Sequence, residues 1–502
     1  METTEKRFAV EFDGAANVID LRPGQAYKSI GGELAGSGRM ERKQATAAGT
    51  KITVNGAEAP LAAYNIGGST YFKLRDLGQA LNIPVIWRRA DDSVRIMTSS
   101  KASVTVTSGK VFAGTDDYYY SNWFEPAKRY LFKEGSTLNL LQVKDEQIHI
   151  QQFDESLGNG KEFTVRMELP LFGGFHRGED GNYYVVYGQS NDEQSDAKAV
   201  YRVVQYDSGW NKLAQADIAN VYVSEPFDAG NLTMDSSGGK LAIHSTRQRY
   251  TSDDGLRHQS NISFLIDMKT MAVLQKGGQW PDNHVSHSFA AYVKFDGNRI
   301  VYVDHGDAYP RSIVMQLEQG GEITREIDLI TFAGKTGDNY TGGYLGGLEV
   351  SKSHYLAAGS SRAYGAEPSG SGQNVFLSVV PKTAQTESEV KTVWLTKHES
   401  DSPIMIKETH LVRLQDDKFV LLWGEEEGYE NEPVLHAAVM DGQGNLLGEP
   451  EALPGVPLPG NMTPLVNGDS LIWYYGEADY RDPVSEASKY SDTLEFYTLK
   501  MN

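Results

Sequence analysis

Apolar residues from about residue 130 onward come in short runs, and each run follows a polar turn. The clearest runs cover residues 183–188, 241–244, 300–303, 355–359, 419–424 and 471–476. They are nearly all apolar, as expected for strands that are buried on both faces. A further strand follows most runs, at 200–206, 262–266, 313–317, 375–380 and 435–440. A four-strand unit that repeats about every fifty to sixty residues is typical of propeller blades, so we predict a β-propeller over residues 130–502.

The first and last of these units are incomplete in sequence. Residues 138–168 lack a recognisable inner strand, and residues 462–500 lack an outer one. Counted separately they give seven blades, which we favour; merged to close the ring, they give six. A β-sandwich array is the rival, but sandwiches do not repeat a four-strand unit in register.

The first hundred residues have a different pattern. Residues 7–13 alternate like a strand and end in an Asp-Gly turn, and residues 51–54 run into Asn55-Gly56, a strong hairpin signal. Leu74, Leu77 and Leu81 form one helical stripe, which we expect to pack on a sheet.

Pro84 ends this helix, and residues 85–87 and 94–97 are predicted to form a closing hairpin. The sequence therefore predicts a small α+β domain over residues 1–100. A linker over residues 101–129, rich in small and polar side chains at its start, would join it to the propeller. The fold class is mainly β.

Residues 64–77, with the sequence YNIGGSTYFKLRDL, resemble the copper amine oxidase N-terminal-like (stalk) domain of Firmicutes surface proteins. The resemblance covers about residues 7–98 and implies a surface stalk. Copper amine oxidases need a His-x-His copper pair and an Asn-Tyr-Asp/Glu cofactor tyrosine. Here His284 and His287 are three residues apart, and Asn182-Tyr183 is followed by Tyr184. We therefore expect that the protein is not a copper amine oxidase.

The C-terminal part is also similar to propeller regions that accompany this stalk domain in Firmicutes surface proteins of unassigned function. The similar segments are residues 172–175, 226–230, 284–289, 304–311 and 409–412. This resemblance implies an extracellular or cell-surface location. It does not indicate any activity. Residues 1–6 have no apolar run typical of a signal peptide, so we expect an exported protein to be present here in its mature form.

Composition and charge exclude several classes of partner and of chemistry. The 502 residues are enough for two domains, and the net charge of −20 argues against nucleic acid as a partner. The chain has no cysteine, which excludes disulfides, thiol nucleophiles and cysteine-ligated metals. No apolar run is long enough to span a membrane. We expect no cofactor and no metal.

In a propeller, the connections that enter inner strands and the turns from second to third strands open on one face. Polar side chains far apart in sequence should converge there. The predicted ligand-binding residues at the starts of inner strands are His176, Asp228, His287 and His410. Those in the connections from second to third strands are Arg247, His258, His305, Asp307, Tyr309 and Arg311. They either bridge blades by hydrogen bonds or form a pocket, in which arginines would hold an anion and tyrosines would stack on sugars.

Binding of an extracellular glycan or surface protein is the function that we favour. The alternative is a polysaccharide-active enzyme. A lyase would use a Tyr or His base and an Arg or His that neutralises the uronate carboxylate, and His287, Tyr309 and Arg311 are the candidates for these roles. A sulfotransferase would use a histidine nucleophile. Propellers host binding and catalysis alike, so the fold does not decide between them.

Overall fold

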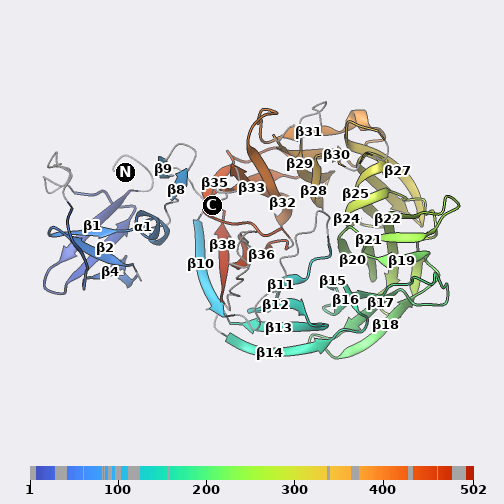
Figure 1. The fold of residues 1–502 in the computed structure, drawn as a ribbon, viewed down its shortest axis with the longest axis horizontal. Coiled ribbons are helices and arrows are strands. Elements are labelled where there is room, and N and C mark those ends of the chain that lie inside the picture. The colour runs from blue at the N-terminus through green and yellow to red at the C-terminus, as the bar shows by residue number, and fades with distance from the viewer. Residues whose placement is uncertain are drawn as a thin grey trace.

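The computed structural model describes fifteen parts of the chain. They are residues 7–28, 42–59, 61–81, 83, 85–88, 93–96, 103–110, 125–154, 159–335, 338, 340–362, 372–427, 434–460, 462–476 and 493–501. Figure 1 shows small N-terminal sheets beside a ring of larger ones. No helix in these parts is long and apolar enough to cross a membrane.

The N-terminal part contains two small sheets, a short helix and a hairpin. The first sheet has the order β1 (Phe8–Asp13), β2 (Val18–Pro23), β4 (Lys51–Val54), β5 (Ala57–Glu58), and the second has the order β3 (Ala45–Ala47), β6 (Ala63–Ile66), β7 (Ser69–Phe72). Helix α1 (Leu74–Ala80) and the hairpin of β8 (Val85–Arg88) and β9 (Ser93–Ile96) follow. These elements match the predicted strand–turn–helix pattern.

The helix buries a narrower stripe than the spacing of its leucines predicts. Leu81 is buried with Ile19, Leu21 and Ile52, and Leu77 packs against this cluster. Leu74, the first leucine of the predicted stripe, is 43% exposed. The helix therefore docks on the sheet through its C-terminal end.

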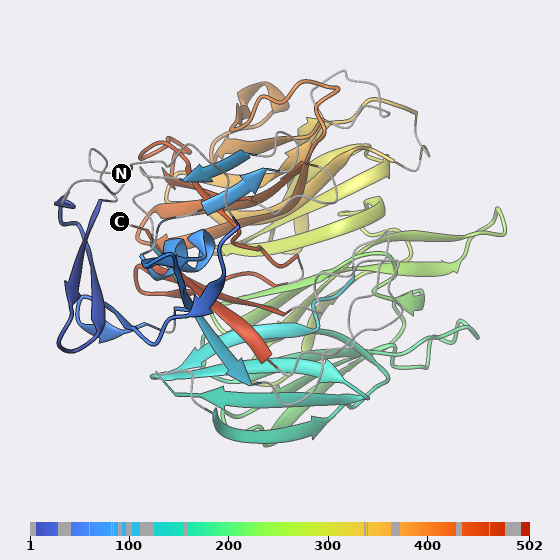
Figure 2. The same ribbon diagram turned by 60° about the vertical axis from the view of Figure 1, so that its left-hand side comes forward.

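The large ring is a β-propeller, as Figure 2 also shows from another side. Its four-stranded groups follow each other along the chain. They are β11 (Arg129–Glu134), β12 (Thr137–Lys144), β13 (Gln147–Phe153), β14 (Asn159–Arg166); β15 (Leu171–Arg177), β16 (Tyr183–Gly188), β17 (Tyr201–Tyr206), β18 (Lys212–Ile218); β20 (Leu232–Ser237), β21 (Lys240–Thr251), β22 (Arg257–Asp267), β23 (Val273–Lys276); β24 (Ser286–Asp296), β25 (Arg299–Tyr309), β26 (Ser312–Gln319), β27 (Glu322–Thr331); β28 (Gly343–Val350), β29 (His354–Ser361), β30 (Asn374–Pro381), β31 (Lys391–Trp394); and β32 (Ile404–Gln415), β33 (Lys418–Glu427), β34 (Val434–Asp441), β35 (Glu451–Pro454). A short 3-10 helix, Glu387–Glu389, precedes β31. From the group of β15–β18 to that of β32–β35, the second strand of each group contains an apolar run that the sequence shows.

The last group draws its strands from both ends of the chain. Strands β36 (Leu465–Asn467), β37 (Ser470–Gly476) and β38 (Thr493–Lys500) pair in turn, and β10 (Ser103–Lys110) completes the sheet beside β38. Ser103 lies opposite Lys500, and Lys110 opposite Thr493. Part of the predicted linker is therefore a propeller strand, while residues 111–124 lie outside the described residues.

Strands β10 and β11 complete the two units that are incomplete in the sequence pattern. The unit at 138–168 gains β11 as its inner strand, and the unit at 462–500 gains β10 as its outer strand. Among the described strands, β20–β23 and β24–β27 share one continuous sheet, joined where Ser260 of β22 meets Ser286 of β24. Because two groups merge, the sheets alone do not fix the blade number, which stays a prediction.

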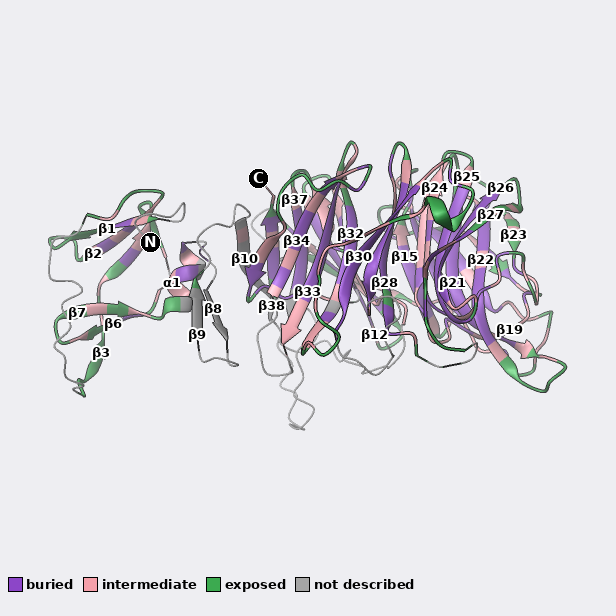
Figure 3. Cartoon of the chain, turned by 90° about the horizontal axis from the view of Figure 1, so that it is seen from above, coloured by how far each residue is buried: buried purple, intermediate pink, exposed green. Residues whose placement is uncertain are grey.

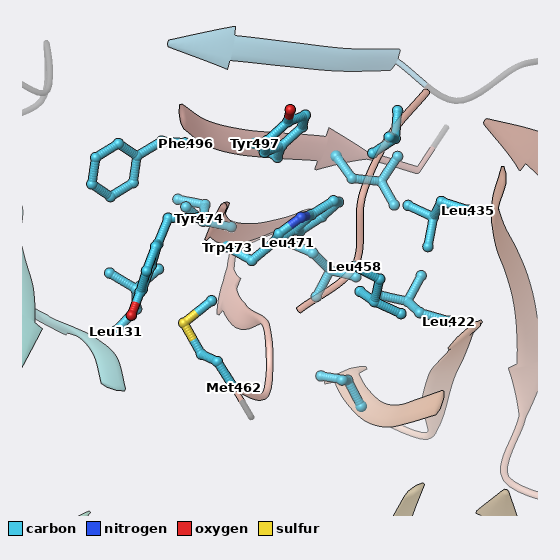
Figure 4. Close-up of a cluster of buried hydrophobic side chains, with 14 of the residues drawn as sticks. Leu131, Leu422, Leu435, Leu458, Met462, Leu471, Trp473, Tyr474, Phe496 and Tyr497 are labelled. Carbon is cyan, nitrogen blue, oxygen red and sulfur yellow. The ribbon is translucent and has the colours of Figure 1, made fainter. Parts of the chain in front are cut away.

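The ring closes over an apolar cluster contributed by the first group and the last two. Trp473 stacks on Tyr497 with ring centroids 5.8 Å apart, and Phe153 meets Phe496 at 5.1 Å. Figure 4 shows side chains of this cluster converging from several strands. Seen from above in Figure 3, buried residues run along the strands, and exposed ones concentrate at their ends.

The two rims of the propeller carry different connections. Ser286, which begins β24, lies opposite Tyr309, which ends β25, so the entry to an inner strand and the second-to-third turn share one rim. We call this rim the loop face. The turns from first to second strands lie at the opposite rim, as with Arg177 and Tyr183.

Candidate functional site

A histidine–aspartate pair lies on the loop face at the start of β24. His287 Nδ1 lies 2.9 Å from Asp307 Oδ1, and Asp307 is buried while the histidine side chain is 33% exposed. Because a carboxylate accepts hydrogen bonds, Nδ1 donates and Nε2 is left as the acceptor. His287 has a φ of 53°, an unusual value for a non-glycine residue. The protein therefore holds this side chain in a fixed orientation at some conformational cost.

Asp228 lies close enough to His287 for the two charges to interact. Burial raises the pKa of Asp228, the charge of Glu225 raises it further, and the charge of His287 lowers it. Asp228 is in the connection between β19 (Val223–Pro226) and β20, on the loop face as predicted. The structure thus brings together Asp228, His287 and Asp307.

Asp228 also lines a cleft of about 610 Å³ between the first three groups. Its ionisable lining residues are Glu125, Lys128, Lys144, Asp145, Glu146, Glu225 and Asp228. Five carboxylates face two lysines, so this part of the loop face repels dense polyanions.

His305 does not join this group, although it lies on the same strand as Asp307. Its Nε2 lies 2.8 Å from Thr341 Oγ1, and its ring packs between Phe289 and Phe332. Burial, and then the charge of Arg311, lower the pKa of His305 to about 3. It is a neutral side chain that bridges two neighbouring groups of strands. His305 thus has the first of the two roles that the sequence allows, bridging blades by hydrogen bonds rather than lining a pocket.

Arg311 is occupied by backbone carbonyls. Its guanidinium donates to the oxygens of Asp307 (2.9 Å), Ala333 (2.9 Å), Asp338 (2.6 Å) and Tyr340 (2.7 Å). These contacts fix the connection between β27 and β28. A side chain with its donors directed this way is not available to neutralise a substrate carboxylate.

Two other predicted residues, His176 and His410, also lie outside the group. His176 is near the end of β15, opposite Tyr184, and its Nε2 contacts Ser236 Oγ at 2.9 Å. Its predicted place at an inner-strand start was wrong, because the Gly-Gly pair at 173–174 lies within the strand rather than before it. His410 was also predicted at the start of an inner strand, and this was wrong, because β32 begins at Ile404 and places His410 in its middle. Its Nε2 donates to the carbonyl of Pro459 at 2.8 Å.

His258 lies near the tip of the β21–β22 hairpin and pairs with Asp254 at 2.7 Å. Arg247 is fully buried, and its contacts are described below. Tyr309 is 65% exposed at the end of β25, so it is accessible on the loop face.

Sequence reasoning missed three exposed aromatic residues on the loop face. Trp280 (59% exposed) follows β23, and Tyr340 (46%) and Tyr344 (37%) lie at the entry to β28. The sequence signal for such residues is a large aromatic side chain within an otherwise polar connection between two strands. The chain has 7 tryptophans and 27 tyrosines, and the sequence does not show which of them are exposed.

A second overlooked group lies on the loop face between β33 and β34. Glu425 contacts His398 Nε2 and His436 Nε2, each at 3.3 Å, and accepts a hydrogen bond from Trp423 Nε1 at 3.0 Å. Burial raises the pKa of Glu425, but the hydrogen bond and charge of His436 and the Trp423 contact outweigh this and hold it at about 2. In the described parts of the chain, no three or more His, Asp or Glu residues are arranged to hold a metal ion.

No family model and no curated protein matches the sequence. Similar solved structures include an ulvan lyase of a polysaccharide lyase family (TM-score 0.44, 10% identity, 73% of this chain and 89% of that chain). Drosophila Plexin A in complex with Semaphorin 1b is another (0.40, 8%, 76% and 88%). A prolyl endopeptidase is a third (0.36, 10%, 86% and 52%), and this chain spans about half its length. Likenesses at these identities and TM-scores carry no information about activity.

Proposed function

We propose that the propeller binds an extracellular glycan on its loop face, and that the N-terminal domain acts as a stalk. The observation that supports this is the placement of aromatic side chains. Among the described residues of the propeller, the exposed aromatic ones are Trp280, Tyr309, Tyr340 and Tyr344, and all lie on the loop face. Exposed aromatic rings stack on the apolar faces of sugars.

Polar groups on the same loop face supply the hydrogen bonds that a glycan needs. Nε2 of His287 is available as an acceptor, since Nδ1 is bound to Asp307. Asp228 offers a carboxyl group nearby. Aromatic platforms next to a few oriented polar groups suit a hydroxyl-rich ligand better than a flat protein surface.

Acid–base catalysis at His287 is a second candidate, favoured by the strained backbone of this residue and by the buried carboxylate behind it. The lyase scheme with Arg311 as neutralising group loses support, because Arg311 binds four backbone carbonyls. A lyase would then need another cation at the uronate.

The test is retention of the protein on immobilised neutral and acidic polysaccharides, followed by calorimetry with the polysaccharide that retains it. We expect Trp280→Ala and Tyr309→Ala each to weaken binding about five-fold, since one stacked ring contributes about 1 kcal/mol. Tyr71→Ala is the matched control, because Tyr71 is 50% exposed in the N-terminal domain. Equal affinity in the two loop-face variants and the wild type would refute the proposal. New unsaturated ends that absorb at about 235 nm, abolished by His287→Ala, would favour catalysis instead.

A further inference from the structure

Two neighbouring arginines on β21 are buried without an anionic partner. Arg247 is 0% exposed and Arg249 is 1% exposed, and as residues i and i+2 of a strand they point to the same side of the sheet. Among the described residues, neither arginine forms an ion pair with a carboxylate. Buried charges are normally paired, so this arrangement needs an explanation.

Arg247 has a structural explanation. Its Nη1 donates to the carbonyl of Val221 at 2.5 Å, Nη2 donates to the carbonyl of Gly278 at 2.6 Å, and Nε donates to Ser260 Oγ at 3.3 Å. These contacts fix two connections of the loop face. Arg247 therefore resembles Arg311 and is not available to a ligand.

Arg249 is different, because its donors are mostly unused. Nη1 makes one long hydrogen bond, 3.4 Å, to the carbonyl of Gln279, and Nε is buried without a hydrogen-bond partner. The guanidinium carbon lies 3.6 Å from the ring centre of Trp280. The exposed indole thus covers a buried cation whose hydrogen bonds are incomplete.

His284 adds a second unpartnered group under the same ring. Its ring centre is 5.1 Å from that of Trp280, and its Nε2 is buried without a partner. Burial, and then the charges of Arg249 and Arg247, lower the pKa of His284 to about 4. The histidine is therefore neutral near pH 7, and its Nε2–H tautomer has a free donor.

The nearest carboxylates are engaged elsewhere. The charge of Asp254 raises the pKa of Arg249, but this carboxylate is hydrogen-bonded to His258 at 2.7 Å. The charge of Asp304 raises the pKa of His284, but this carboxylate is hydrogen-bonded to His244 at 2.8 Å. In the parts of the chain that the structure describes, no carboxylate binds the free donors of Arg249 and His284.

We propose that Arg249 and His284 form a subsite for one oxyanion of the bound glycan, a carboxylate or a sulfate ester, with Trp280 as its movable cover. This inference rests on the proposed glycan binding and names the class of sugar. The indole turns aside so that the anion reaches Nε of Arg249 and Nε2 of His284, and the sugar ring then packs on the indole. The acidic cleft and the net charge of −20 restrict the ligand to a low density of negative charge.

The experiment is titration of the whole protein with sodium sulfate and, separately, sodium glucuronate at constant ionic strength, followed by calorimetry and tryptophan fluorescence. We expect saturable binding of at least one anion and a fluorescence change, because Trp280 moves. Stronger binding of sulfate would identify the oxyanion of the glycan as a sulfate ester, and stronger binding of glucuronate would identify it as a uronate carboxylate. Trp280→Phe should abolish the fluorescence change while calorimetric binding persists.

Arg249→Gln should weaken anion binding at least ten-fold, and His284→Phe should weaken it as well. Arg257→Gln is the matched control, because Arg257 lies on the neighbouring strand but is exposed and paired with Asp192 at 3.0 Å. Circular dichroism checks that each variant is folded; if Arg249→Gln does not fold, His284→Phe decides. Absence of saturable binding of either anion, or unchanged affinity in the folded variants, would overturn the subsite.

The subsite and the proposed function fail in different ways. Glycan binding that depends on Tyr309 but not on Arg249 would refute the subsite and leave the function in place. Anion binding that depends on Arg249, in a protein that no polysaccharide retains, would refute the glycan proposal and leave the subsite in place.

Discussion

Substitution of Trp473 by alanine should destabilise the whole propeller, because this side chain lies where the two ends of the ring meet. Trp473 is 0% exposed, stacks on Tyr497, and its Nε1 donates to the carbonyl of Pro457 at 2.9 Å. Figure 4 shows it within the apolar cluster, with Leu435 of β34 on one side and Tyr474 and Leu131 of β11 on the other. The indole therefore packs where strands from the start and the end of the propeller sequence meet.

The expected magnitude follows from two losses. Truncation of a buried tryptophan to alanine costs about 3–5 kcal/mol, which includes the cavity that remains. The buried carbonyl of Pro457 loses its donor, which costs about 1 kcal/mol more. We therefore expect the free energy of unfolding to fall by roughly 4–6 kcal/mol.

The assay is equilibrium unfolding in urea, followed by far-ultraviolet circular dichroism. Trp280→Ala is the control, since that indole is 59% exposed and should cost less than about 1 kcal/mol. A decrease of less than about 1 kcal/mol for Trp473→Ala would show that the cluster does not hold the ring together.

Three further outcomes are expected. A fragment that begins at residue 125 lacks β10 and should unfold at a lower urea concentration than one that begins at residue 101; equal midpoints would exclude β10 as the closing strand. Arg311→Gln should lower the free energy of unfolding by about 2–3 kcal/mol, because four backbone carbonyls lose a charged donor; a change below about 0.5 kcal/mol in urea titration would contradict this. The free energy of unfolding should also fall as the pH is lowered from about 6.5 to 4, since buried neutral histidines have folded pKa values of about 3 to 4 and the unfolded chain takes up protons first. Urea midpoints that do not change over this pH range would contradict the burial of these histidines, which are His176, His284, His305 and His410.

The repeated architecture could be predicted because the second strand of each group is buried on both faces. Such strands appear in sequence as uninterrupted apolar runs, as at residues 183–188 and 419–424. Strand β10 was not recognised for the opposite reason. It alternates small, polar and apolar residues, and its pairing with β38 joins positions almost four hundred residues apart, which no local pattern encodes.

The candidate site was predicted only in part. Topology correctly placed Asp228, His287 and Asp307 on one rim, because strand entries and turns determine which rim a residue occupies. Residue type alone could not tell which polar side chains are used by the fold. Arg311 and His410 bind backbone carbonyls of connections that are distant in sequence, and such carbonyls leave no trace in the pattern of side chains.

The most direct test of the central claim is hydrogen–deuterium exchange of the protein with and without a polysaccharide that it retains. Glycan binding on the loop face predicts slower exchange in residues 277–287, 305–312 and 340–344, which carry the exposed aromatic residues and His287. Residues 178–182 and 296–299, at the opposite rim, should exchange at the same rate in both states. Protection confined to the opposite rim or to the N-terminal domain would contradict the account.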